Sequence, residues 1–127
     1  MDVKKSFAKP ELEANGVWIE YRDGGKVLLA RMGNPKFQAE MDRLLKPFRR
    51  KSNPDPQKQT EVLCRCLANS VLLDWEGFTD DGAELKYSKD AAARLLERHM
   101  DFRNDVVRLA SEEQHFYEEE LGADAKN

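Results

Sequence analysis

The sequence predicts a mainly α-helical domain of the α+β class, a small bundle of about four helices with an N-terminal β-hairpin. Two observations favour this fold. Two short β-prone runs, 17–22 and 26–31, flank the turn sequence Asp23-Gly24-Gly25. Beyond these runs, apolar residues recur at the spacing of amphipathic helices. The 127 residues suffice for a single domain, and we expect residues 1–15 and 122–127 to be flexible ends.

The turn is the clearest signal for the hairpin, because Asp-Gly and Gly-Gly supply the positive φ angles that tight hairpin turns need. In the first run, Val17 and Ile19 alternate onto one face and Trp18 lies on the other. The second run, from Val27 to Ala30, is apolar on both faces. We therefore expect helices to cover the hairpin.

Two helices should follow the hairpin. Asn34 and Pro35 are typical of the N-cap and first turn of a helix. The apolar residues of the first helix recur at one face: Phe37, Met41, Leu44, Leu45 and Phe48. Residues 51–56 contain two prolines and are expected to form a loop. The second helix should run to about Leu73, with these residues on its buried face: Val62, Leu63, Cys66, Leu67 and Val71.

Residues 74–87 have a different composition from the helices around them. Asp81-Gly82 marks a tight turn, and large apolar side chains surround it: Trp75, Phe78, Leu85 and Tyr87. We interpret the segment as a compact, packed loop that can contain a small β element. Ser88 is then expected to cap a third helix, and Asp101 a fourth helix that extends to Tyr117.

No catalytic, cofactor or metal site is predicted. Cys64 and Cys66 are two residues apart on a helix, so their side chains diverge, and we expect reduced thiols. The turn at Gly82 lacks the ligand spacing of a calcium-binding loop. His99 and His115 lie on separate predicted helices and form no zinc motif. We therefore expect a protein that is not an enzyme.

Charge is unevenly distributed along the chain. Overall, 24 acidic against 21 basic residues give a net charge of -3, so we expect binding to neither nucleic acid nor an anionic membrane. Residues 36–58 hold seven basic and three acidic residues, whereas residues 97–127 hold nine acidic and four basic ones. Solvated helix faces are the simplest interpretation. The alternative is a surface for an acidic partner or for head-to-tail self-association, formed by Arg43, Lys46, Arg49, Arg50 and Lys51.

The N-terminal residues precede no apolar stretch of the signal-peptide type, and the longest apolar runs are far too short to span a membrane. An intracellular protein is therefore expected.

Two segments resemble the tail assembly chaperones of long-tailed, siphovirus-type phages. The first runs from Gly16 to Phe37, and the second combines Asp-Trp-x-Gly at 74–77 with the Asp-Gly turn and a Tyr-Ser pair before a helix. Together they cover most of residues 16–110. We expect their motif residues to have structural roles: Trp18, Asn34, Pro35, Asp74, Trp75, Gly77, Phe78, Asp81, Gly82, Tyr87 and Ser88.

The resemblance implies a non-enzymatic, homo-oligomeric protein of the host bacterial cytoplasm. Such a protein binds the tape measure protein, helps tail tube protein to polymerise around it, and is absent from the finished virion. The resemblance also implies a longer frameshifted form, and the codons of residues 125–127 can contain the slippery run A-AAA-AAC. Two alternatives remain: a head–tail or tail adaptor retained in the particle, and a small nucleic-acid-binding regulator that uses the five basic residues named above.

Overall fold

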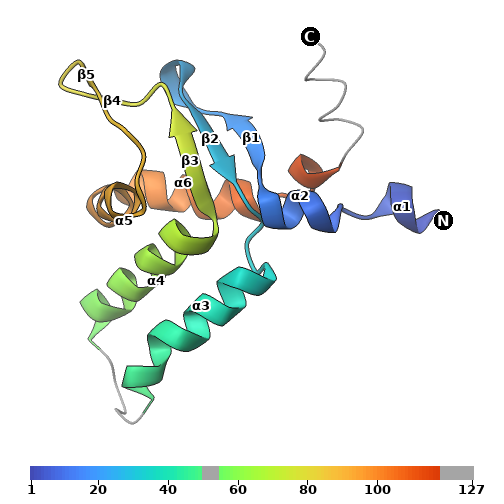
Figure 1. Ribbon diagram of the computed structural model, residues 1–127, viewed down its shortest axis with the longest axis horizontal. Coiled ribbons are helices and arrows are strands. Elements are labelled where there is room, and N and C mark those ends of the chain that lie inside the picture. The colour runs from blue at the N-terminus through green and yellow to red at the C-terminus, as the bar shows by residue number, and fades with distance from the viewer. Residues whose placement is uncertain (50–54, 118–127) are drawn as a thin grey trace.

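A three-stranded antiparallel sheet lies at the centre of the computed structural model, which describes residues 1–49 and 55–117 (Figure 1). Its order is β1 (Val17–Glu20), β2 (Lys26–Leu29) and β3 (Leu72–Glu76). Helices form most of the rest of the domain. One helix passes behind the sheet, and a pair of helices extends away from it (Figure 1).

The predicted β-hairpin is present. Strands β1 and β2 pair with Val17 opposite Leu29, and a short 3₁₀ turn, η1 (Arg22–Gly24), joins them. Asp23 in this turn has φ of 53°, a left-handed conformation that Asp adopts more readily than most residues. Trp18 points to the outer face of the sheet and is 42% exposed.

The expected bundle of about four helices is wrong. β2 pairs on its second side with β3, where Val27 lies opposite Trp75 and the register shifts between Leu28 and Leu29. β2 buries Val27 and Leu29 on the core face, whereas Leu28 is half-buried on the outer face, opposite Trp18. The described residues therefore form a mixed α+β domain, which also has a second two-stranded antiparallel hairpin made of β4 (Thr79–Asp80) and β5 (Ala83–Glu84).

The predicted end of the second helix is corrected for the same reason. This helix, α4 (Pro56–Ser70), stops where Val71 N–H donates to Leu67 O at 2.9 Å. The chain then enters β3 directly, and Val71 O accepts from Ala30 N at 2.9 Å. Three consecutive apolar residues fit both a helix and a buried strand, so periodicity alone extended the helix too far.

The other helices begin near the predicted positions. α3 (Pro35–Leu45) starts after Asn34, and α5 (Lys89–Arg98) starts after Ser88. The fourth predicted helix is α6 (Met100–Ser111), which passes behind the sheet (Figure 1). His99 occupies its N-cap position, whereas Asp101, the expected cap, lies in its first turn. It ends before Tyr117, because residues 113–116 form a separate 3₁₀ turn, η3 (Glu113–Phe116).

Residues 1–15, expected to be a flexible end, contain two short helices, α1 (Val3–Ser6) and α2 (Pro10–Asn15). α2 is held against the domain, since Lys9 N donates to Phe116 O at 3.0 Å and Arg31 N donates to Glu13 O at 2.8 Å. α1 extends outward from α2 (Figure 1). The other expected flexible end, 122–127, lies outside the described residues.

The core lies between one face of the sheet and the helices. Strand residues such as Val27 and Trp75 pack with Leu67 of α4, Leu96 of α5 and Val106 of α6 in one cluster. Phe116 of η3 is fully buried in the same cluster.

Candidate functional site

The α3–α4 pair is the most prominent projection of the domain (Figure 1). It consists of α3, the short 3₁₀ turn η2 (Lys46–Phe48) and α4. The C-terminal half of α4 is anchored in the core by buried side chains that include Leu67 and Ala68, whereas α3 has no fully buried residue. The pair is thus rooted in the core at one end and solvated along α3.

Asn34 fixes the root of the pair. Its side-chain oxygen accepts from Phe37 N at 3.0 Å and so caps α3. Its side-chain amide donates to Arg31 O at 2.7 Å and to Ser70 O at 3.1 Å, at the end of α4. Pro35 occupies the first turn of α3, where no N–H is needed. A buried Asn with all of these bonds fixes how α3 leaves the sheet.

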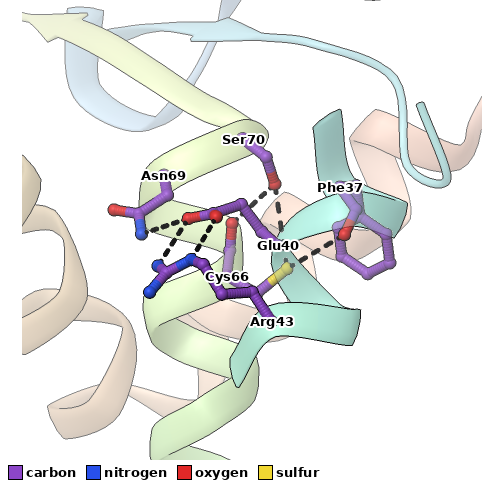
Figure 2. A network of polar contacts seen from close by, with 6 residues as sticks. All are labelled: Phe37, Glu40, Arg43, Cys66, Asn69 and Ser70. Carbon is purple, nitrogen blue, oxygen red and sulfur yellow. Dashed lines mark hydrogen bonds and ion pairs between the residues drawn. The ribbon is translucent and has the colours of Figure 1, made fainter. Parts of the chain in front are cut away.

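A polar network joins the middle of α3 to the C-terminal end of α4 (Figure 2). Glu40 of α3 accepts from Asn69 Nδ2 of α4 at 2.7 Å and from Arg43 Nε and Nη2 at 2.9 and 3.1 Å. The hydrogen bonds from Arg43 and Asn69 lower the pKa of Glu40 to about 2. Glu40 therefore stays ionised at every pH the cell experiences, and it holds α3 against α4.

Cys66 and Ser70 complete the network on the α4 side (Figure 2). Cys66 Sγ donates to Phe37 O at 3.6 Å, and Ser70 Oγ donates to Cys66 O at 2.6 Å. Burial raises the pKa of the Cys66 and Cys64 thiols. Both cysteines are buried and free, and raised thiol pKa values are typical of unreactive, structural cysteines.

The apolar face of α3 is only partly used by the core. Phe37 packs against the core cluster. The next four apolar residues are half-buried and lie outside that cluster, and we call them the α3 stripe: Met41, Leu44, Leu45 and Phe48. An amphipathic helix normally buries its apolar face against its own domain. In this protein α3 packs on α4, so the α3 stripe is partly covered, and only the remaining part of its apolar area stays in reach of solvent.

The predicted basic patch falls at the far end of α3. Two of its members are paired with carboxylates of α3, Arg43 with Glu40 and Arg49 with Asp42. Lys46 is exposed. The remaining two, Arg50 and Lys51, lie outside the described residues. Because paired cations attract a partner less strongly than unpaired ones, the patch is a weaker electrostatic feature than its sequence indicated.

The second motif, residues 74–88, is built around Trp75. Its indole is 4% exposed, donates from Nε1 to Leu85 O at 2.7 Å and stacks on Phe78 at 4.8 Å between ring centroids. Tyr87 contacts the same indole edge-on and donates its hydroxyl to Leu72 O at 2.7 Å. This aromatic group fastens the loop onto the sheet.

The turns and caps of this motif have the backbone its sequence favours. Gly77 and Gly82 have φ of 75° and 82°, and Asp81 has φ of 51°, all in the left-handed region. Asp74 Oδ1 accepts from Trp75 N at 2.8 Å, and Ser88 Oγ accepts from Ala91 N at 3.0 Å. These residues shape the loop and the start of α5.

Within residues 1–49 and 55–117, no three His, Cys, Asp or Glu side chains lie close enough together to hold a metal ion. His115 Nε2 lies 2.9 Å from Glu112 Oε1, and His99 is exposed beside α6. No helix in these ranges is both long and apolar enough to cross a membrane.

Comparison with known protein families indicates the origin of this protein. The family model described as YdaY prophage protein matches residues 32–127, which include the α3–α4 pair, the aromatic loop, α5 and α6. The chain belongs to the YdaY prophage protein family. Membership of the YdaY family shows that the protein is phage-derived, as the resemblance implied. It does not show that the protein acts in tail assembly. Neither the curated proteins nor the solved structures include a significant match.

Sequence reasoning missed two polar sites of this YdaY-family protein. The i, i+3 spacing of Glu40 and Arg43 was a usable local signal for their ion pair. Asn69, the third member, is 29 residues from Glu40 along the chain, and only the packing of α3 on α4 brings them together. Likewise, no sequence pattern indicated that Tyr21 meets Asp105 across 84 residues.

Proposed function

We propose that this YdaY-family protein is a phage tail assembly chaperone. It binds the tape measure protein in the host bacterial cytoplasm and promotes polymerisation of the tail tube protein through protein–protein contacts. Three features support this proposal: the prophage origin, the two sequence segments that resemble such chaperones, and the α3 stripe. The α3 stripe carries most of the argument.

A chaperone for an aggregation-prone helical partner needs an apolar surface that covers apolar stripes on that partner. The α3 stripe supplies such a surface on a helix whose start is fixed by Asn34 and whose middle is held by Glu40. A rigid helix presented in this way binds with little loss of conformational entropy. The stripe therefore provides the affinity in this proposal.

The basic residues contribute less. Arg43 and Arg49 are engaged by carboxylates of α3 itself, and Lys46 remains an exposed cation beside the stripe. Exposed charges at the rim of an interface raise the association rate more than the affinity. In this proposal Lys46 steers an acidic partner toward the α3 stripe.

Co-expression tests the proposal. The protein is produced together with the tape measure protein of the same prophage, and the soluble, co-purifying fraction of the latter is measured. We expect rescue by the wild type, loss of rescue with Leu44→Asp in the stripe, and full rescue with Ala39→Asp on the exposed opposite face of α3. Circular dichroism of both variants checks that each retains its fold.

Equal rescue by both variants would contradict a role for the stripe. Failure of the wild type, repeated with the longer frameshifted form where the gene encodes one, would contradict the chaperone function itself. Mass spectrometry of purified virions distinguishes the chaperone from the main alternative, a head–tail or tail adaptor. A chaperone is absent from the particle, whereas an adaptor is present in stoichiometric copies.

A further inference from the structure

The first seven residues, here called the N-terminal arm, leave apolar side chains in water. All seven residues are exposed. Val3 is 62% exposed, and Phe7, which directly follows α1 in an extended conformation, is 56% exposed. Elsewhere in the described ranges, the large exposed hydrophobic residues are Trp18 and Met100. Exposed apolar side chains gathered on one projecting segment indicate a docking element.

A groove of about 570 Å³ lies at the root of this arm, between α2 and the start of α3. Its size is within the range of clefts that enclose bound groups, roughly 300–1,000 Å³. Apolar atoms of four residues line it: Pro10, Ala14, Met32 and Pro35. Glu13 and Arg31, joined by an ion pair of 2.6 Å, form a polar wall.

The charges of the arm and the groove are complementary. The arm has two exposed lysines, Lys4 and Lys5, and one exposed acid, Asp2, whose carboxylate accepts a hydrogen bond from Lys4 N, so its side chains carry a net positive charge. Near the groove, Glu11 is exposed on α2, and Glu113 lies 3.8 Å from Arg31 with 64% of its side chain exposed. A cationic, apolar segment therefore matches an apolar groove with an acidic border.

We propose that the protein forms a two-fold dimer in which the N-terminal arm of each copy lies in the α2–α3 groove of the other. Ala8 packs against the core and Lys9 N is bonded to Phe116 O, so the chain is fixed where the arm leaves the domain. From this point α1 extends outward, away from α2 and from the start of α3 (Figure 1). Because the groove lies beside the arm's root, one two-fold axis seats both arms at once.

Sedimentation analysis of the full chain tests the dimer. We expect a concentration-dependent dimer whose dissociation constant rises roughly 10- to 300-fold with Phe7→Asp, because the dimer loses two Phe side chains, each 56% exposed before association. Ala14→Arg, which fills the groove from an exposed position, should weaken the dimer similarly. Met100→Asp and Ala39→Arg are matched controls at exposed positions elsewhere, and they should leave the dissociation constant unchanged.

Mixing the two interface variants gives the decisive result. A pair of Phe7→Asp and Ala14→Arg chains retains one intact arm–groove contact, whereas either homodimer retains none. We therefore expect native mass spectrometry to show the mixed dimer in excess of both homodimers.

Three outcomes would overturn the proposal: a wild type that stays monomeric, a Phe7→Asp variant that dimerises like Met100→Asp, or no preference for the mixed dimer. A monomeric wild type that binds phosphatidylglycerol vesicles through Phe7 would instead identify the arm as a membrane-surface segment. These readouts use the protein alone, so they are independent of the chaperone test.

Discussion

The Tyr21 hydroxyl donates a hydrogen bond of 2.5 Å to Asp105 Oδ2 and thereby joins the β1–β2 hairpin to α6. Arg22 Nη2 donates to the same oxygen at 2.8 Å, and Arg108 lies 3.6 Å from the other carboxylate oxygen. The bond from Tyr21 lowers the pKa of Asp105, while burial and that same bond raise the pKa of Tyr21 to about 12. This link holds the turn of the hairpin against a helix on the far side of the core.

Tyr21→Phe should lower the free energy of unfolding by about 1.5–3 kcal/mol, the usual value of a hydrogen bond to a charged group. The ring stays in place against Phe78 and Phe102, so packing is preserved. Tyr87→Phe, which removes a bond to the uncharged Leu72 O, is the matched control and should cost less. Urea unfolding measures both, and a larger loss for Tyr87→Phe would contradict the charged link.

Glu40→Gln should make stability less dependent on pH in the acid range. The pKa of Glu40 is lowered from 4.5 to about 2 in the folded protein. Its carboxylate therefore stabilises the fold fully above pH 4.5, and this contribution is lost as the pH falls toward 2. The difference between wild type and Glu40→Gln should be largest at neutral pH and shrink below pH 4.5 in urea titrations.

The same experiment in an Asn69→Ala background tests the network of Figure 2. If Asn69 and Glu40 act together, the effect of Glu40→Gln will be smaller there than in the wild type. Simple additivity of the two substitutions would show that the bond across the two helices contributes nothing to stability.

Trp75→Ala should cost about 3–5 kcal/mol, the typical loss for a buried aromatic residue, and leave the domain unfolded or aggregated. The indole is 4% exposed and contacts both Phe78 and Tyr87. Trp18→Ala is the internal control, since Trp18 is 42% exposed on the outer sheet face. In thermal unfolding followed by circular dichroism, Trp75→Ala should have a much lower melting temperature than Trp18→Ala. Similar melting temperatures would mean that Trp75 is not part of the core.

Gly77→Ala should be more destabilising than Gly82→Ala. Both glycines have positive φ, so an added side chain costs roughly 1–2 kcal/mol at either position. A Cβ at Gly77 would also come within 3.2 Å of Gly24 O, whereas a Cβ at Gly82 meets no atom within 4 Å. Equal losses in chemical denaturation would show that the approach of Gly77 to the hairpin turn is unimportant.

Local signals predicted local structure well. Asn34 and Ser88 cap the helices α3 and α5, Pro35 starts α3, and Asp23-Gly24 forms the hairpin turn. Each depends on hydrogen bonds or φ angles within a few residues, which the sequence specifies directly. β3 was missed because it follows α4 without a breaker, and its apolar residues continue the helical pattern.

The candidate site divides in the same way. The amphipathic pattern of α3 is visible in the sequence from Phe37 to Phe48. Phe37 reaches the core, whereas the α3 stripe does not. This difference depends on where α4 and the sheet end. The exposed N-terminal arm and its groove likewise depend on the hydrogen bonds that hold α2 against η3 and against Arg31, which follows β2.

The sequence by itself determined the turns, the helix starts and the alternation of β1, because these follow from backbone preferences and side-chain period. Only the tertiary structure decided that β2 is a central strand, that Trp75 is buried while Trp18 is not, and that Glu40 meets Asn69. Burial and long-range pairing depend on which elements pack together, and residues far apart in the chain have no local preference that specifies their neighbours.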